Sequence, residues 1–542
     1  MNIIEAIKNR ILKFLGLDEI GYNPYSERLT YIGNPDEILA QNISEARVWY
    51  IGDSNELLNY YTNEQMHDNH NEAVYNRNRS NYFWGISSQE ANIKRVHSGL
   101  PKAIVDTLTN AIGFPTITAK YQGKEVDIPA FLEALELKKK TMQEQMPLTM
   151  AIGYGAWKIN IDPDFSKSPI LEYYEAKDVE FVAKYGKIIG VIFKDYYKYD
   201  RKNYLLLDTR HLDKNGDSVI DFELFELTNR NDVKPVPLDT IPDLARLADK
   251  NKSQGIEGYK RILAVPCRFL FDPNNPNYGK SIYAGRYDLF DDLDQSLSQR
   301  SQTSRVSTPV EYYPVDMLER SKRDGSPTLP SVYNRQYVKK EGIPDGNGNV
   351  DSMIQTTQPQ LNFAQYNEEQ REIVSMILNG LLSPATMGID LARKDNAEAQ
   401  REKEKVTIMT RDSIIAQETE ILKSLIRVCL DVQAYINTGL IPLDDSDTEI
   451  SVKFNQFANP SFESLSQTLS PMLANGTISV EMYVDKLYGD SLSKEEKQRE
   501  IEALKANQSR DDLEQGDFDS DKVGESDQNE KTELKEDDTE EE

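Results

Sequence analysis

The segment Asn274–Ser281, NNPNYGKS, comes closest to a catalytic motif in this sequence. Its last three residues match the end of a phosphate-binding loop, in which backbone amides, a lysine and a hydroxyl hold phosphate and Mg²⁺. Asn274 replaces the first glycine of that motif, and Pro276 removes an amide from the part that would cradle phosphate. The run Tyr204–Asp208 would be the accompanying Mg²⁺-binding strand. Two interpretations stay open: a nucleotide-driven motor, and a Pro/Gly turn capped by Ser281 before a helix.

Two histidines and two acidic loops have spacings that metal sites also use. His67 and His70, in MHDNHNE, are three residues apart, but no cysteine or third histidine lies near them in the sequence. We therefore expect a solvated helix end there. The runs DKNGD at Asp213 and DGNGNVD at Asp345 offer oxygen ligands but lack the closing glutamate of a calcium-binding loop. Hairpin turns explain both runs.

Three carboxylates, those of Asp291, Asp292 and Asp294, are close enough in sequence to bind a metal ion together. On a helix they more simply form a polar face, which is the interpretation we adopt. The sequence contains no nucleophile elbow, no serine, histidine and aspartate set, and no dinucleotide-binding fingerprint. We therefore predict no catalytic residue, no metal ligand and no cofactor, in a protein that is not an enzyme.

The chain of 542 residues is too long for one ordinary domain. With 38% hydrophobic residues it can bury substantial cores, so we expect several folded parts. Two cysteines, Cys267 and Cys429, exclude a disulfide framework and a cysteine-based zinc module, and fit a reducing cytoplasm. No run approaches the length of a membrane span. Residues 1–17 mix apolar and charged positions, which predicts an amphipathic helix and no signal peptide.

The net charge of −27 is divided unevenly. Residues 511–542 hold 16 acidic residues and 3 lysines, a net −13, which leaves −14 for residues 1–510. The scarcity of apolar residues in this tail predicts disorder, and the tail either solubilises the chain or docks electrostatically. The rest of the chain lacks the basic stripe of a protein that grips DNA phosphates, which disfavours tight nucleic-acid binding. An acidic surface past which DNA slides is compatible with this charge.

Hydrophobic periodicity predicts an α+β fold. Residues 36–114 are mainly helical by this criterion, and the last helix carries Leu100, Ile104, Leu108 and Ile112 at four-residue spacing. From residue 154 the period changes to two, which indicates strands. The predicted strands lie at 154–161, 179–182, 188–193, 204–207 and 219–227, with a buried strand within 261–271.

The second half of the sequence predicts two helices that bracket a small β-rich module. The first helix, 281–305, ends in QSLSQRSQTSR, which is polar on every side. Because such a helix is seldom stable alone, we expect neighbours, including copies of itself, to hold it. The module at 306–363 is close to neutral, with many Pro, Gly and Tyr residues. After it we predict a helix at 364–382, a break at LLSPATMGID, a helix of about 63 Å at 395–436, and short helices within 461–507.

The order of these segments resembles the portal, or head-to-tail connector, proteins of tailed bacteriophages over residues 40–510. Few other families insert a small β module between two helices and then continue into a long charged helix. The acidic tail past residue 511 lies outside this family pattern. The stretches that carry the resemblance are GLPKAIVDTLTNAIGFP, AIGYGAWKINIDPD, NPNYGKSIYAGRYDLFDDLDQSLS, NGLLSPATMGID running into DNAEAQREKEKVTIMTRDSIIAQ, and NGTISVEMYVDKLYGDSLSKEEKQREIEALK.

The resemblance implies a ring of identical subunits, commonly twelve, at one vertex of the capsid. Each subunit would have a wing, a two-helix stem, a clip, a tunnel loop and a crown. The implied boundaries are the wing at 1–270, the stem at 271–305 and 364–382, the clip at 306–363, the tunnel loop at 383–394, the long wing helix and a strand at 395–455, the crown at 456–510 and a disordered acidic tail at 511–542.

The implied function is a channel for DNA packaging and ejection that docks the terminase large subunit and later the head-completion adaptor protein. The other implied partners are copies of itself, the major capsid and scaffolding proteins, and double-stranded DNA passing without sequence specificity; a membrane is not among them. The protein would belong to the virion, and to the host cytoplasm during assembly, with the terminase as the energy source. The remaining alternative is an unrelated scaffold or minor head protein whose long helix forms a coiled coil.

The resemblance also singles out individual residues. The tunnel loop facing DNA would contain Ser383, Pro384, Ala385, Thr386, Met387 and Gly388. Basic residues that would brake DNA on the channel wall are Lys280, Arg300, Arg393 and Lys394, and the tyrosines that would dock partners on the clip are Tyr312, Tyr313, Tyr333 and Tyr337.

Overall fold

The chain divides into two compact units in this computed structural model. Unit 1 comprises residues 1–393 and 400–457, and unit 2 comprises residues 394–399 and 458–542. The described residues form an α+β protein that is about half helical, which confirms the predicted α+β class. They include no helix that is long and apolar enough to cross a membrane. The structure describes residues 35–62, 82–86, 93–213, 215–227, 233–248, 254–256, 258–306, 310–314, 325, 336–340, 355–357, 363–389, 397–440, 448–455, 462–475, 477–488 and 494–515.

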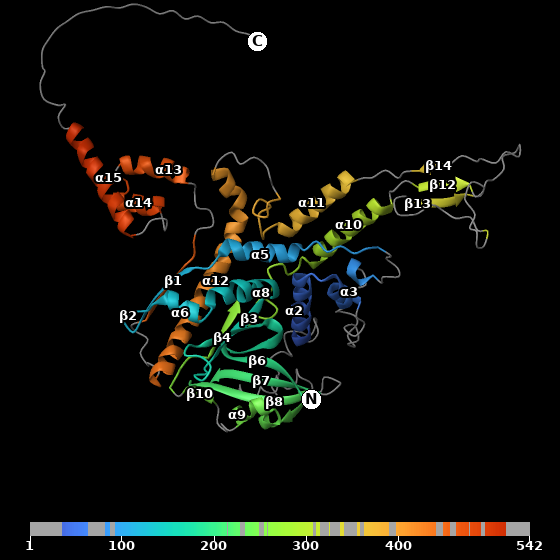
Figure 1. Ribbon diagram of the computed structural model, residues 1–542, viewed down its shortest axis with the longest axis horizontal. Helices are drawn as coiled ribbons and strands as arrows, with labels where there is room; N and C mark the ends of the chain where they lie inside the picture. The colour runs from blue at the N-terminus through green and yellow to red at the C-terminus, as the bar shows by residue number, and fades with distance from the viewer. Residues whose placement is uncertain are drawn as a thin grey trace, which may run out of the picture. The chain divides into compact units, whose positions relative to one another are not determined.

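Helices α2, α5 and α8 pack together near the start of unit 1 (Figure 1). The predicted apolar stripe of α5 is buried along the whole helix, and Gly113 ends the helix at a positive φ of 67°. A π-turn, η4, leads directly into α8. The bounds are α2 (Pro35–Ile51), α3 (Ser54–Thr62), η3 (Phe83–Gly85), α5 (Leu100–Ile112), α6 (Ile128–Ala134), α7 (Leu137–Lys140), η4 (Thr141–Gln145) and α8 (Met146–Ile152).

Strand β3 is the centre of a three-stranded antiparallel sheet, with β11 on one side and β4 on the other. The sequence pattern predicts that β3 buries alternate residues, but the strand is buried at every position from Tyr154 to Ile159. The reason is that α8 packs on this sheet while β6 of a second sheet contacts β11. The bounds are β3 (Tyr154–Asn160), β4 (Ile170–Glu175) and β11 (Ala264–Arg268).

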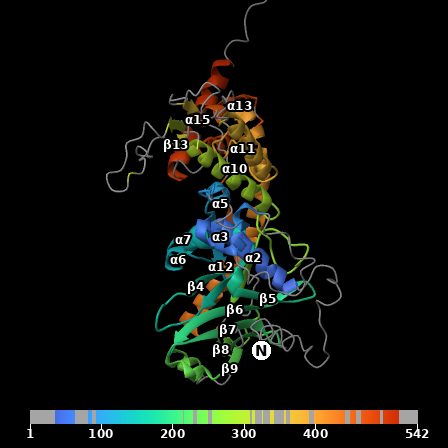
Figure 2. The same ribbon diagram turned by 90° about the vertical axis from the view of Figure 1, so that its right-hand side faces the viewer.

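The second sheet has six strands in the order β10-β8-β7-β6-β5, with β9 beside β8, and Figure 2 shows β6, β7 and β8 following one another. Turns at Tyr185–Gly186 and Asn215–Gly216 connect its hairpins, and Tyr185 and Gly186 both have positive φ. The Asp213 carboxylate accepts the Asn215 and Asp217 amides, so a hairpin turn explains DKNGD as predicted. The bounds are η5 (Ala176–Asp178), β5 (Val179–Lys184), β6 (Lys187–Tyr199), β7 (Lys202–Leu212), β8 (Ser218–Leu227), β9 (Val233–Val236), η6 (Leu238–Thr240), η7 (Pro242–Leu244), α9 (Ala245–Ala248) and β10 (Gln254–Ile256).

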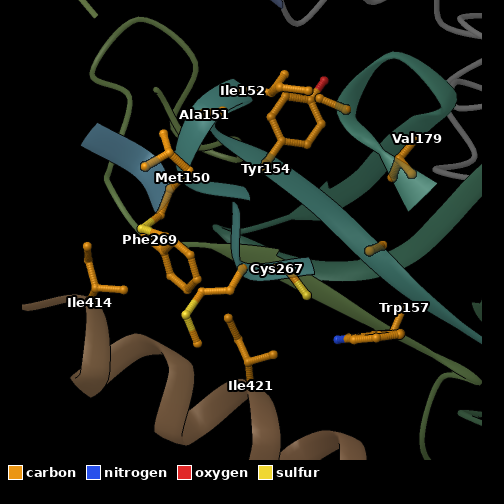
Figure 3. Packing of buried hydrophobic residues seen from close by; sticks show 14 of the residues in the cluster. Met150, Ala151, Ile152, Tyr154, Trp157, Val179, Cys267, Phe269, Ile414 and Ile421 are labelled. Atoms are coloured by element: carbon orange, nitrogen blue, oxygen red, sulfur yellow. The ribbon is translucent and has the colours of Figure 1, made fainter. Parts of the chain in front are cut away.

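One large hydrophobic core joins these elements to the long helix α12. In Figure 3, Ile414 and Ile421 of α12 point toward the side chains of Met150 and Cys267, which come from α8 and β11. All four side chains are at most 7% exposed. The long helix is therefore part of the core of unit 1.

Helices α10 and α11 run antiparallel and bracket a small sheet in the sequence, as predicted. Helix α10 begins six residues later than the predicted Ser281, because residues 281–286 form turns in which Ser281 Oγ accepts the Tyr283 amide. The sheet has the order β13-β12-β14, parallel between β12 and β13 and antiparallel between β12 and β14. The bounds are α10 (Tyr287–Val306), β12 (Val310–Pro314), β13 (Gln336–Lys340), β14 (Gln355–Thr357) and α11 (Phe363–Leu378).

After a break, α12 runs without interruption from Ala397 to Thr438, 42 residues, in close agreement with the predicted helix. At 1.5 Å per residue this is about 63 Å. The chain then returns as β15, which pairs antiparallel with β1, so that the sheet order is β15-β1-β2. The bounds are α12 (Ala397–Thr438), β1 (Thr116–Tyr121), β2 (Lys124–Glu125) and β15 (Glu449–Lys453).

Unit 2 is helical where it is described. Its three helices enclose a small core around Val484, and Lys497 Nζ lies 2.7 Å from a carboxylate oxygen of Asp485. The last helix extends to Gln515, so residues 511–515 are helical and the prediction of disorder from residue 511 is wrong there. The bounds are α13 (Phe462–Ala474), α14 (Val480–Tyr488) and α15 (Lys494–Gln515).

Several predictions fall outside the described residues. They concern the helix at 1–17, His67 and His70, the loop at Asp345, and the tail at 516–542.

Candidate functional site

The segment NNPNYGKS forms a tight turn packed against α8, without the geometry of a phosphate-binding loop. Gly279 approaches Gly153 so closely that a Cβ on Gly279 would lie 2.3 Å from the Gly153 carbonyl oxygen. The Lys280 amide donates to the Leu270 carbonyl at 3.1 Å, and the Ile282 amide donates to the Met150 carbonyl at 3.0 Å. These amides are therefore used within the fold. The helix that follows, α10, begins only at Tyr287, so its N-terminus does not directly follow Ser281 as it would in a phosphate-binding loop.

Asp208, the candidate Mg²⁺ ligand, is already bound by two cations. Both carboxylate oxygens accept from Arg210, each at 3.1 Å, and Lys158 Nζ lies 3.0 Å away. The carboxylate is 1% exposed, and these neighbours hold its pKa below the ordinary value despite burial. Asp208 therefore holds β3 and β7 together. No group of acidic, histidine or cysteine side chains in the described part of the chain is arranged to hold a metal ion.

The acidic cluster on α10 does not form a solvated polar face, and that prediction is wrong for two of its three residues. Asp291 is 4% exposed and accepts the amides of Phe83 and Trp84 at 2.7 and 3.2 Å. Burial raises its pKa to about 7, against the opposing effect of those two amides. Asp292 remains exposed, as predicted.

Asp294 is fully buried and holds a second backbone segment against the same helix. Its carboxylate accepts from Trp84 Nε1 at 3.1 Å and from the Ser98 amide at 2.8 Å, and one oxygen lies 2.7 Å from His97 Nδ1. The sequence contained a signal for this role. Asp294 stands four residues after Phe290 and three before Leu297, which places its side chain on the apolar side of α10.

The polar C-terminal half of α10 is held by α11 through hydrogen bonds. Ser296 bonds to Glu369 and Gln370 on α11, at 3.3 and 3.4 Å. At the other end of the pair, Arg286 donates from Nε to the Ile377 carbonyl and from Nη2 to the Asn379 carbonyl, both at 2.9 Å. The expectation that neighbours hold this polar helix is thus met within one chain by α11. Whether copies of the chain add to it stays a prediction.

The outward surfaces of α10 and α11 are predominantly acidic. Their exposed charged residues, where the structure describes side chains, are five acidic and two basic: Asp288, Asp292, Glu368, Glu369 and Glu372 against Arg305 and Arg371.

The break between α11 and α12 is compact, and most of it faces the protein. Ser383 is 5% exposed, and Met387 packs against the main core. Pro384, Ala385 and Thr386 are half-buried, so only Gly388 and Ile389 are exposed among residues 383–389. The turn closes when the Ile389 amide donates to the Pro384 carbonyl, with Gly388 at φ 72°. The predicted DNA-facing role of this break stays a prediction, and exposure among residues 383–389 is confined to its end.

Thr407 of α12 holds this break against the long helix through hydrogen bonds. Its hydroxyl oxygen is buried, accepts the Ser383 amide at 2.9 Å and lies 2.8 Å from Thr386 Oγ1. Thr407→Val keeps the shape of the side chain but removes the hydroxyl oxygen that accepts the Ser383 amide. We expect a loss of about 1–3 kcal/mol in the free energy of unfolding and faster hydrogen exchange at Ser383. Thr410→Val, on the same helix, is the matched control; equal effects of both substitutions on Ser383 exchange would contradict the assignment.

The predicted basic residues and tyrosines lie in different environments. Lys280 is exposed, whereas Arg300 is half-buried against α11, where Nη1 donates to Gln370 Oε1 at 3.2 Å. In the small sheet, Tyr312 pairs in register with Val338, Tyr313 with Lys339, and Tyr337 with Glu311. Arg393, Lys394 and Tyr333 lie outside the described residues.

A buried carboxyl on α12 was missed by the sequence analysis. Glu418 is 0% exposed and accepts from Gln145 Nε2 of the π-turn η4 at 3.0 Å, while its second oxygen has no hydrogen-bond partner among the residues that the structure describes. Burial raises its pKa to about 8. Glu418 stands three residues after Ile415 and four before Leu422, so its place on the apolar side of the helix was visible in the sequence.

Comparison with known proteins gives no further assignment. No protein-family model and no curated protein matches this chain.

Proposed function

We propose that this chain is the subunit of a portal ring, a channel for double-stranded DNA at one vertex of a tailed-phage capsid. In this proposal α10 and α11 form the stem, the sheet of β12, β13 and β14 forms the clip, and α12 is the long wing helix. The subunit hydrolyses nothing, and the terminase large subunit and the head-completion adaptor dock on the clip. The chain also meets major capsid and scaffolding proteins during assembly in the host cytoplasm.

The observation that carries the proposal is the sequence of elements from α10 to α12. Two antiparallel helices enclose a small three-stranded sheet between them in the chain, and a tight break then leads into a helix of 42 residues that enters the core. This is the order that the resemblance to portal proteins requires. The polar contacts between α10 and α11 also favour a helix pair whose other faces meet copies of itself, as in a closed heterologous ring.

The charges on the helix pair suit a conduit. Five exposed acidic residues against two basic ones on α10 and α11 give a surface that repels phosphate. A wall that binds phosphates tightly would hold DNA in place, since each phosphate contact adds to affinity. A repelling wall lets the duplex move.

The hydrogen bonds around Lys280 and the burial of α12 do not favour the two alternatives, a nucleotide-driven motor and a coiled-coil scaffold. A nucleotide-driven motor needs free amides around Lys280, but the amides of Lys280 and Ile282 donate to the Leu270 and Met150 carbonyls. Before Lys280, the amides of Asn274 and Tyr278 are also bonded within the turn. A coiled-coil scaffold needs an apolar stripe of α12 that faces outward. The C-terminal half of α12 instead buries its stripe in the core of its own chain, at Leu422, Leu425 and Cys429.

The test is to purify the full chain, image it by electron microscopy and measure its mass by light scattering. We expect rings with a central hole, with a mass of about twelve subunits, either alone or after addition of the scaffolding and major capsid proteins. Compact particles without a channel under both conditions would overturn the proposal. ATP hydrolysis that Lys280→Ala abolishes would establish the motor instead.

A substitution at the end of the break tests the tunnel-loop assignment. Met387→Asp is unsuitable because Met387 packs against the core, so the exposed Ile389, 48% accessible, is the better position. We expect Ile389→Asp to leave the stability and the ring unchanged and to lower DNA packaging by at least tenfold. The reason is that the tunnel loop is proposed to contact the duplex directly, so a carboxylate there meets phosphates at close range, unlike the stem wall past which the DNA slides. Ile389→Asn is the uncharged control. Packaging yields equal to the parent's would contradict a DNA-facing role for this residue.

A further inference from the structure

An apolar groove of about 780 Å³ opens on unit 1 between β1, α6 and η4. Ile117 and Ile128 form its buried floor, and Phe114, Leu132 and Met142 are half-buried walls. The exposed Pro129 lies at its edge, in the first turn of α6. Figure 1 shows α6 alongside β1 and β2, where this groove is formed. Six of its twelve lining residues are apolar and include both floor residues, as in a site for an apolar side chain.

The rim of the groove carries both signs of charge. Glu133 and Glu136 come from the end of α6 and the turn after it, and Lys138 and Lys139 come from α7. All four are exposed. An apolar floor with charged residues around it is the arrangement that receives an amphipathic helix, whose apolar face enters the groove while its polar face stays in water.

Residues 1–17 of this chain have the sequence of such a helix. Ile4, Ile7, Ile11 and Leu15 recur at spacings of three and four residues, and the charged residues fall between them. A helix of this length is marginal by itself in water, so its stripe needs an apolar surface to cover it. The segment carries three basic residues and one acidic residue, a net +2, whereas residues 1–510 as a whole carry −14.

The chain between the segment and the groove is long enough. Helix α2 begins at Pro35 and packs on α8, and η4, which forms one wall of the groove, leads directly into α8. At about 10 Å per packed helix, the groove lies roughly 20 Å from α2, and the 17 residues of α2 add at most about 25 Å to its distance from Pro35. The 17 residues from 18 to 34 span up to about 56 Å. The segment can therefore reach the groove of its own chain.

We propose that residues 1–17 bind as an amphipathic helix in the groove between β1, α6 and η4 of the same chain. The apolar stripe fills the groove, and the basic residues of the segment face Glu133 and Glu136. This inference is independent of the portal proposal, since it uses only contacts within one subunit.

Cysteine cross-linking of the full chain tests the pairing directly. The two native cysteines are buried and unpaired, so they can stay in place. We expect Ile7→Cys with Pro129→Cys to form an intrachain disulfide under mild oxidation, at least tenfold faster than Asn9→Cys with Pro129→Cys. Asn9 is the control because it lies about 200° around the helix from Ile7. Equal rates for the two pairs would overturn the proposal, and a disulfide between chains would assign the groove to a neighbouring copy's segment.

Trypsin digestion gives a second readout that does not depend on a cross-link. The segment contains three cleavage sites, at Lys8, Arg10 and Lys13. Pro129→Asp places a charge at the edge of the groove, and an acidic residue in the first turn of a helix is favourable for the helix itself. We expect at least tenfold faster cleavage at the three sites in this variant, and no change in Pro163→Asp, an exposed position in another loop.

Equal cleavage in the parent and both variants would overturn the proposal. So would sedimentation of the full chain with phosphatidylglycerol vesicles in the absence of the intrachain disulfide, because it would assign the amphipathic segment to a membrane surface.

Discussion

Asp294→Ala will lower the free energy of unfolding of unit 1 by about 3–5 kcal/mol, the largest loss we expect from a single substitution in α10. The carboxylate is fully buried and accepts from Trp84 Nε1 and from the Ser98 amide, with His97 Nδ1 at 2.7 Å. Removing it leaves these buried polar groups without their acceptor, and each unpaired group costs about 1–3 kcal/mol. The segment at 93–99 and η3 then each lose a contact with α10, although Asp291 still accepts the Phe83 and Trp84 amides.

Urea unfolding followed by tryptophan fluorescence measures this loss, because Trp84 is itself a partner of Asp294. Asp292→Ala is the matched control, because it removes another aspartate carboxylate from the same helix, at an exposed position two residues away. It should change the free energy of unfolding by less than about 0.5 kcal/mol. Comparable losses in the two variants would show that Asp294 does not anchor these segments. Because α10 is the proposed stem, we also expect Asp294→Ala to weaken ring assembly.

Glu418→Gln will stabilise the protein at alkaline pH and reduce the pH dependence of its stability. Burial raises the pKa of Glu418 to about 8, from an ordinary value of 4.5. Between these values the folded protein keeps a proton that the unfolded chain has released, so the free energy of unfolding falls as the pH rises. The loss is complete above pH 8 and absent below about pH 4. A shift of this size corresponds to about 3–5 kcal/mol at pH 8.5.

Glutamine keeps a carbonyl oxygen for Gln145 Nε2 but has no charge to desolvate, so it escapes this loss. We expect the variant to exceed the parent in stability at pH 8.5 and to match it at pH 4. Asp291, whose pKa is raised to about 7, also makes the free energy of unfolding fall as the pH rises. The variant therefore keeps a pH dependence of stability, but a smaller one than the parent. Thermal unfolding from pH 4 to 9 measures both curves, with the exposed Glu420→Gln as control. Parallel curves for parent and Glu418→Gln would refute the assignment.

The sequence by itself determined the elements whose signals are local. The four-residue stripe of α5 follows from side-chain periodicity, and the glycine after it ends the helix. The hairpin at Tyr185–Gly186 follows from turn chemistry, and the long α12 follows from the absence of any helix breaker. The order of helix, small sheet, helix, break and long helix was predicted from the same signals. Each depends on neighbours a few residues away, which the sequence displays directly.

The tertiary structure alone decided what the polar and small residues do, because their partners are distant in the sequence. Asp294 meets Trp84 from 210 residues away, and Glu418 meets Gln145 from 273 residues away. The close approach of Gly279 to Gly153 leaves no room for a side chain at a turn whose sequence resembles a phosphate-binding loop. A carboxylate costs free energy when it is buried alone and stabilises the fold when buried donors surround it, so its role depends on the elements that enclose it. Residue type and spacing do not specify those elements, and only the folded chain brings them together.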